Sequence, residues 1–218
     1  LHAILARFHV RFPQIAALDP EHARRELEAE SRAEFVAGIE RDALELGWLE
    51  RWLKLLPDYL DWQRDREAAG WRFAQAEQRR ALDVELADGA PLRIEGYVDR
   101  IDTDAGGRIG LIDYKTQSPA VLAAKFAQPG EDVQLAVYTM LCGDAVGEAA
   151  YLSLDAEIRA RELPEAQAAA ADQFQRLTAI FEALRAGAPL AAHGASGVCA
   201  RCAARGLCRR DWCVDDDD

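Results

Sequence analysis

The strongest constraint on the fold is a pair of alternating segments, 96–102 and 111–116, joined across a glycine-containing turn. Alternation of apolar and polar residues is typical of β-strands, and the turn sequence Asp-Ala-Gly-Gly is typical of a hairpin. A three-residue loop at 105–107 would pair Asp104 with Arg108. The pattern therefore predicts two antiparallel strands whose register is set by this loop.

In that register two carboxylates face each other. Asp99 is directly opposite Asp113, and cross-strand partners have Cβ atoms about 5 Å apart. Lys115 projects from the same face, because side chains alternate along a strand. The chain has only three lysines against 23 arginines, so a lysine at this position is less easily explained by composition alone. Since like charges so placed repel each other, we expect a divalent metal ion between the carboxylates, beside the lysine.

The rest of the chain divides into helical and strand patterns. Helices are expected at 1–13, from 20 to about 69 with a break at Pro57, at 119–128, 131–142 and 163–186, and strands at 71–86, 91–103, 108–116 and 147–154. This order of elements predicts an α+β or α/β domain: helices come first, then an antiparallel meander, two helices, a strand and a last helix.

Composition limits the class of protein. The chain has 218 residues, half of them hydrophobic, which is enough for one good core. No apolar run approaches the roughly 20 residues that span a bilayer, and no signal peptide is visible, so we expect no membrane partner. Five cysteines, three of them crowded near the C-terminus, favour a reducing cytoplasm over a secreted disulfide framework. Because the chain opens with Leu1 inside a helical pattern, we expect a C-terminal fragment of a larger protein.

The net charge of −12 argues against a generic nucleic-acid binder, whose affinity rests on basic surface. Two features soften this objection. Residues 215–218 alone supply four of the acidic charges, and arginines cluster near the C-terminal cysteines, at Arg201, Arg205, Arg209 and Arg210. A metal-dependent site also needs acidic residues where its ions bind.

Several motifs occur in an order that resembles a known family. They are a histidine on an early helix (His2), a Gly-x-x-Asp-Arg-x-Asp strand (Asp99), an Asp-Tyr-Lys-Thr strand (Asp113, Lys115), a Gln-x-x-x-Tyr helix (Gln134, Tyr138) and a C-terminal cysteine set. Together they resemble the RecB-type branch of the PD-(D/E)XK nucleases, which includes nuclease domains of bacterial helicase–nucleases and CRISPR-associated exonucleases. The match runs nearly end to end.

This resemblance implies a single domain with a restriction-endonuclease-like α/β core. A central mixed β-sheet would be flanked by helices, with residues 14–69 as a helical insertion and 195–213 as a cysteine-rich segment. It also implies Mg²⁺- or Mn²⁺-dependent hydrolysis of phosphodiester bonds in DNA, as an exonuclease in recombination and repair. The implied partners are single-stranded DNA or DNA ends and a helicase domain or subunit. The alternative is a non-catalytic DNA-end-binding module of a helicase–nuclease complex.

The resemblance also assigns roles to single residues. The metal ligands it implies are His2, Asp99, Asp113 and the backbone carbonyl of Tyr114. Lys115 would orient the attacking water or stabilise charge on the phosphate, while Gln134 and Tyr138, on one helix face, would border the site. Glu77 resembles an acidic residue upstream of the hairpin, although Glu85 and Glu95 offer competing carboxylates. Arg100 and Asp102 alternate to the opposite face, where we expect a structural ion pair.

The C-terminal cysteines have the spacing of metal ligands. Cys199-x2-Cys202-x5-Cys208 suits an iron–sulfur cluster or Zn²⁺. In related nucleases three such cysteines hold a [4Fe-4S] cluster with a fourth that lies before the early histidine, and this chain begins at that histidine. Either the fourth ligand is missing, or Cys213 serves in its place.

Overall fold

The structure, a computed structural model, describes residues 1–39, 44–127, 132–189, 199–200 and 202–208. Its helices are α1 (His2–Arg11), α2 (Pro20–Ile39), α3 (Leu44–Ala68), α4 (Pro119–Lys125), α5 (Gln134–Cys142), α6 (Ala166–Arg185) and α8 (Arg205–Cys208). Its strands are β1 (Arg72–Glu85), β2 (Pro91–Thr103), β3 (Ile109–Lys115), β4 (Val146–Leu154) and β5 (Ile158–Glu162). The chain divides into two compact units, Leu1–Arg176 and Leu177–Asp218, with the boundary inside α6.

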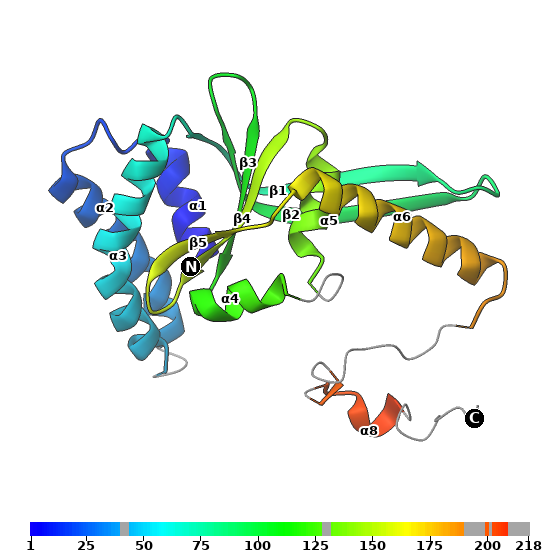
Figure 1. Ribbon diagram of the computed structural model, residues 1–218. Helices are drawn as coiled ribbons and strands as arrows, with labels where there is room; N and C mark the ends of the chain where they lie inside the picture. Colours follow the sequence, from blue (N-terminus) through cyan, green and yellow to red (C-terminus); the bar gives the residue numbers. More distant parts are fainter. Residues whose placement is uncertain (40–43, 128–131, 190–198, 201, 209–218) are drawn as a thin grey trace. The chain divides into compact units, whose positions relative to one another are not determined.

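The first unit is built on a mixed five-stranded sheet in the order β1-β2-β3-β4-β5 (Figure 1). Neighbouring strands are antiparallel except β3 and β4, which are parallel and are connected through α4 and α5. A parallel pair requires such a crossover, because the chain must return to the starting edge of the sheet. The fold is therefore α/β, a mixed sheet flanked by helices, as the sequence predicted.

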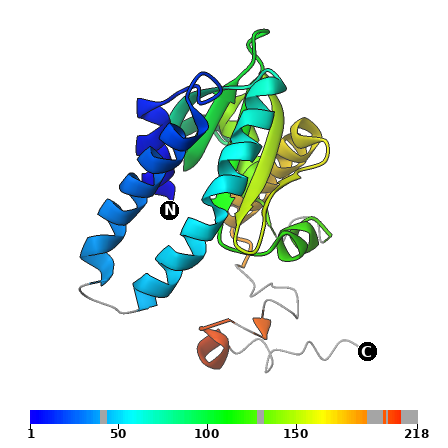
Figure 2. The same ribbon diagram turned by 90° about the vertical axis from the view of Figure 1, so that its left-hand side faces the viewer.

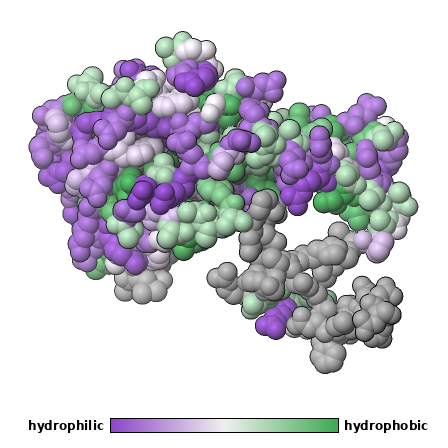
Figure 3. All heavy atoms as spheres, viewed as in Figure 1, coloured by the Kyte–Doolittle hydropathy of each residue, from purple (hydrophilic) through white to green (hydrophobic). Residues whose placement is uncertain are grey.

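Side-chain alternation in the central strands gives the sheet two hydrophobic faces. On one face Ile112 and Leu152 join the core formed with the first three helices. On the other face Leu111 and Tyr151 pack with residues of α4 and α5, including Leu122. Figures 1 and 2 show α1, α2 and α3 side by side against the first face. In the view of Figure 3, the side covered by α2 and α3 is mostly hydrophilic, as expected for the outer surface of amphipathic helices.

The hairpin register predicted from the sequence is confirmed. Arg100 pairs with Ile112 and Thr103 with Ile109, while the backbone N–H of Asp104 donates to the carbonyl of Arg108 at 3.1 Å. The loop is thus the three residues 105–107, in which Gly107 has φ +79°. Glycine adopts this left-handed conformation without steric cost, which explains the turn sequence.

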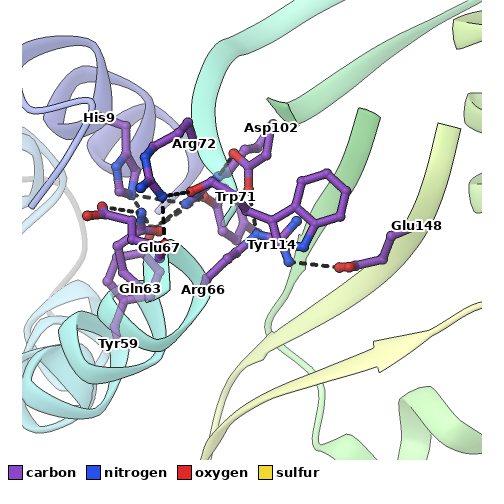
Figure 4. Close-up of polar contacts among 11 residues, drawn as sticks. His9, Tyr59, Gln63, Arg66, Glu67, Trp71, Arg72, Asp102, Tyr114 and Glu148 are labelled. Atoms are coloured by element: carbon purple, nitrogen blue, oxygen red, sulfur yellow. Dashed lines mark hydrogen bonds and ion pairs between the residues drawn. The ribbon is translucent and has the colours of Figure 1, made fainter. Parts of the chain in front are cut away.

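A buried charge network lies beneath the hairpin, on the side of α1 and α3 (Figure 4). Arg100 Nε donates to Asp102 Oδ1 at 2.7 Å, and Arg66 from α3 donates to both Asp102 and Glu148. Both Arg100 and Asp102 are almost fully buried. Burial alone would raise the pKa of Asp102, but the two guanidinium groups outweigh it and lower that pKa. The structural ion pair predicted at this position is confirmed.

One local prediction is wrong, and one strand was not predicted. Pro57 does not break the helix, because α3 continues through it to Ala68, anchored on either side by buried Leu56 and Tyr59. Packing here outweighs the hydrogen bond that proline cannot donate. The short strand β5 was also missed, since its sequence Ile-Arg-Ala-Arg-Glu carries three charges and resembles a loop. It forms as an edge strand on β4, where charged side chains are common.

No helix in the described ranges is long and apolar enough to cross a membrane.

Candidate active site

The two facing aspartates are held by neighbouring strands. The register of β2 and β3, continued one step beyond the Arg100–Ile112 pair, places Asp99 opposite Asp113. Asp99 Oδ2 accepts a hydrogen bond from the backbone N–H of Tyr114 at 2.9 Å, which fixes its carboxylate against β3. Asp113 is only 1% exposed. Both carboxylates therefore have restricted orientations before any ligand arrives.

Lys115, Gln134 and Tyr138 form a connected polar group around Asp113. Lys115 Nζ lies 2.6 Å from Asp113 Oδ2 and donates to Gln134 Oε1 at 2.7 Å. The amide nitrogen of Gln134 donates to Asp113 Oδ1 at 2.7 Å and contacts the hydroxyl of Tyr138 at 2.8 Å. Gln134 begins α5, and Tyr138 lies one turn later on the same helix face. The structure thus brings all four of these predicted site residues together.

His2 reaches this group from α1. Its Nε2 lies 3.0 Å from the backbone carbonyl of Tyr114 and 3.7 Å from Asp99 Oδ2. His2 lies 112 positions from Tyr114 in the chain, and the packing of α1 on the sheet brings it to the other two groups. His2, Asp99 and the Tyr114 carbonyl were predicted as metal ligands, and they are neighbours here.

Glu77 is the upstream carboxylate that lies closest to these residues. One ligand atom each from His2, Glu77 and Asp99 lie within 4.8 Å of one another. Glu77 falls opposite Asp99 in the β1–β2 register and has φ +49°, a conformation that non-glycine residues rarely adopt and that occurs often at functional sites. By contrast, Glu95 pairs with exposed Arg79, and Glu85 lies at the far end of β1. The structure favours Glu77 among the three candidates.

The electrostatics of the site suit a cation. Burial and the neighbouring carboxylate of Asp113 raise the pKa of Asp99 to about 6. Burial also raises the pKa of Asp113, with Lys115 acting in the opposite direction. Two partly desolvated carboxylates thus disfavour their own ionisation, and a bound divalent ion would reverse this.

The donor set also fits such an ion. Asp113 Oδ2 is buried, and within the described residues its close contact is the ion pair with the Lys115 ammonium at 2.6 Å. This oxygen, together with Asp99, Glu77, His2 and a backbone carbonyl, offers mostly hard oxygen ligands, which Mg²⁺ and Mn²⁺ prefer. A bound ion would polarise a phosphate and lower the pKa of an attacking water.

A groove of about 640 Å³ opens beside these residues. Its lining includes His2, Tyr114, Lys115 and Lys125. Lys125 was not predicted as a site residue, although the scarcity of lysine could have drawn attention to it. The ammonium groups of Lys115 and Lys125 lie 5.1 and 5.0 Å from the centroid of the Tyr151 ring, so both cations contact the same buried aromatic side chain.

The cysteines belong to the second unit. Cys199, Cys202 and Cys208 are not in disulfides, and a turn connects the backbones of Cys199 and Cys202. Across the residues that the structure describes, they form no group close enough to hold a metal ion. Cys213 lies outside the described residues. The predicted iron–sulfur or zinc site therefore stays a prediction.

Comparison with known proteins defines the class. The family model of the PD-(D/E)XK nuclease superfamily matches residues 1–209, nearly the whole chain. The chain belongs to the PD-(D/E)XK nuclease superfamily, and this membership implies a nuclease, a hydrolase of a kind that generally uses divalent metals.

Other comparisons are less specific. A solved structure described as "Crystal structure of SSO0001" is similar, with 15% identity, a TM-score of 0.42, and coverage of 87% of this chain and 80% of that one. A search of curated proteins found no match.

Proposed function

We propose that this chain is a Mg²⁺- or Mn²⁺-dependent DNA nuclease of the RecB-type branch, acting as an exonuclease in recombination or repair. One observation carries the proposal: Asp99, Asp113 and Lys115 lie on one sheet face, with His2 packed against them. Modules that have lost their chemistry usually lack the aspartate or lysine of this strand, and both are present. Single-stranded DNA or a DNA end is the proposed substrate, and a helicase domain or subunit the proposed partner.

The residues have separable tasks in such a reaction. Asp99, Asp113, Glu77, His2 and the Tyr114 carbonyl would hold the metal, which supplies Lewis acidity to the phosphate and its attacking water. Gln134 bridges Asp113 and Lys115, so it holds the carboxylate and the ammonium in a fixed relation. Lys115 Nζ donates to Gln134 Oε1 and forms an ion pair with Asp113 Oδ2. Because an ammonium has three N–H donors, these two contacts within the described residues leave at least one donor to orient water or stabilise charge on the phosphate.

The test is hydrolysis of end-labelled single- and double-stranded DNA, and of a matched RNA strand, with Mg²⁺ or Mn²⁺. Lys115→Ala should reduce cleavage by about 100-fold or more. Lys54→Ala is the matched control, because Lys54 is an exposed lysine on α3, and it should cleave like the wild type. The product ladder separates terminal from internal cleavage.

Two outcomes would contradict the proposal. Equal cleavage by Lys115→Ala and wild type would mean that the activity comes from another site or a contaminant. Binding of DNA ends without cleavage under any metal condition would instead support the non-catalytic end-binding module.

A further inference from the structure

His9 is a buried polar side chain that takes no part in the carboxylate site. It lies on α1 seven residues after His2, which is about two turns further along the same face of the helix. Its ring is fully buried and stacks on Phe73 of β1 at a centroid distance of 5.3 Å. Its Nε2 atom lies 2.6 Å from the hydroxyl of Tyr59 and 3.2 Å from Nη1 of Arg100. Polar contacts therefore attach the last turn of α1 to both α3 and β2.

The chemistry of these contacts determines the state of the His9 imidazole. A guanidinium group can only donate, so Nε2 of His9 accepts from Arg100. Burial and the positive charge of Arg100 lower the pKa of His9 well below its ordinary value, so the ring is neutral and carries its proton on Nδ1. His9 is thus an acceptor for a buried cation. A side chain of the same shape without an acceptor would leave that cation with one partner fewer.

The same guanidinium nitrogen also contacts Tyr114, on the strand that carries the site. Arg100 Nη1 lies 3.4 Å from the hydroxyl of Tyr114, and this hydroxyl lies 3.4 Å from that of Tyr59 (Figure 4). Arg100 is itself held by its ion pair with Asp102, so its position does not depend on α1. Tyr114 therefore contributes to both groups: its side chain joins the buried network, and its backbone carbonyl contacts His2.

We propose that His9 is a positioning residue for the metal site, because it fixes α1 on the sheet so that His2 meets the Tyr114 carbonyl. The inference rests on the proposed function, which takes His2 and this carbonyl as metal ligands. The His2 side chain is 47% exposed, so its immediate surroundings restrain it little. Its position is set instead by the helix that carries it, and the contacts of His9 hold that helix. Residues that orient a metal ligand in this way contribute strongly to metal affinity.

The test is Mn²⁺ affinity without DNA, measured from the electron paramagnetic resonance signal of the free ion. His9→Phe keeps an aromatic ring on Phe73 and removes the acceptor, and it should bind Mn²⁺ about tenfold more weakly than the wild type. His9→Gln should recover most of the affinity, because its amide oxygen can take the place of Nε2. His2→Ala should weaken binding about as much as His9→Phe. The double variant should bind no more weakly than His2→Ala, because His9 acts through His2.

Leu27→Ala is the matched control for stability, since Leu27 is buried in the same core on α2, and it should unfold more easily but bind Mn²⁺ like the wild type. Circular dichroism checks that each variant is folded; if His9→Phe is not, Tyr59→Phe replaces it and should give the same pattern.

The proposal is overturned if the folded His9 variant binds Mn²⁺ like the wild type, if the two losses multiply in the double variant, or if the wild type binds no Mn²⁺. The nuclease function fails separately: the expected affinities without any DNA cleavage by the wild type would support the role of His9 and reject the nuclease.

Discussion

Replacing Asp99 by asparagine should make the metal-free protein more stable at neutral pH. The folded protein raises the pKa of Asp99 from an ordinary value of 3.8 to about 6, first by burial and then by the charge of Asp113. About two pH units correspond to about 3 kcal/mol of cost for keeping this carboxylate ionised in the folded state. The amide oxygen of the introduced asparagine would accept more weakly from the Tyr114 N–H, so we expect a net gain of about 1–2 kcal/mol in the free energy of unfolding.

The pH dependence of the free energy of unfolding tests independently whether the ionised Asp99 carboxylate destabilises the folded protein. Because the folded-state pKa is raised, the folded protein binds more protons than the unfolded chain between about pH 4 and 6. The free-energy cost of keeping the Asp99 carboxylate ionised in the folded protein is fully present above about pH 6 and disappears as the pH falls towards about 4. The stability difference between Asp99→Asn and the wild type should shrink over the same interval.

The measurement is urea unfolding at several pH values in EDTA, repeated with Mg²⁺. Added Mg²⁺ should stabilise the wild type by mass action, by about 2.7 kcal/mol at a hundredfold excess over the dissociation constant, and should stabilise the variant much less. Asp102→Asn is the matched control on the same strand. Asp102 is paired with Arg100 and Arg66, so this change should destabilise the protein by about 3–5 kcal/mol. A variant Asp99→Asn that is less stable than the wild type in EDTA at neutral pH would refute the reasoning.

Three further outcomes follow from other contacts. Gly110→Ala should lower the free energy of unfolding by about 1–3 kcal/mol in urea titrations, because its Cβ would lie 2.6 Å from Arg66 Nη2. Glu67→Gln should cost about 1–3 kcal/mol in the same titrations, since the Glu67 carboxylate accepts from two backbone N–H groups after α1; an unchanged midpoint would show that these bonds contribute little. Lys125→Ala should raise the KM for single-stranded DNA about tenfold and leave Mg²⁺-dependent stabilisation unchanged; a lost metal response would place Lys125 in the metal site instead.

Much of the fold and the paired carboxylates could be predicted because they depend on local chemistry. A glycine-containing turn sets the register of β2 and β3, and the period of two in a strand then places Asp99, Asp113 and Lys115 on one face. His2, Gln134 and Tyr138 came from the family resemblance, and the structure places them beside these residues. Their roles in catalysis stay predictions until variants are measured.

The remaining features depend on contacts that a linear pattern does not contain. Pro57 stays helical because buried neighbours hold α3 in place, and β5 forms only because β4 offers it an edge. Lys125 and His2 line one groove, although 123 positions separate them in the sequence. The sequence likewise offered Glu77, Glu85 and Glu95 as the upstream acidic residue, and only the strand register shows which of them lies near Asp99.

The contact between His2 and the Tyr114 carbonyl, 112 positions apart, also bears on when the protein can act. During synthesis β3 emerges long after α1, so the contact of His2 with the Tyr114 carbonyl cannot form in a nascent chain that stops before the hairpin. In the finished protein, detachment of α1 from the sheet would remove the histidine and leave the carboxylates in place. The site that we propose is therefore complete only in the finished fold, and a partly folded chain would lack the histidine proposed as a metal ligand.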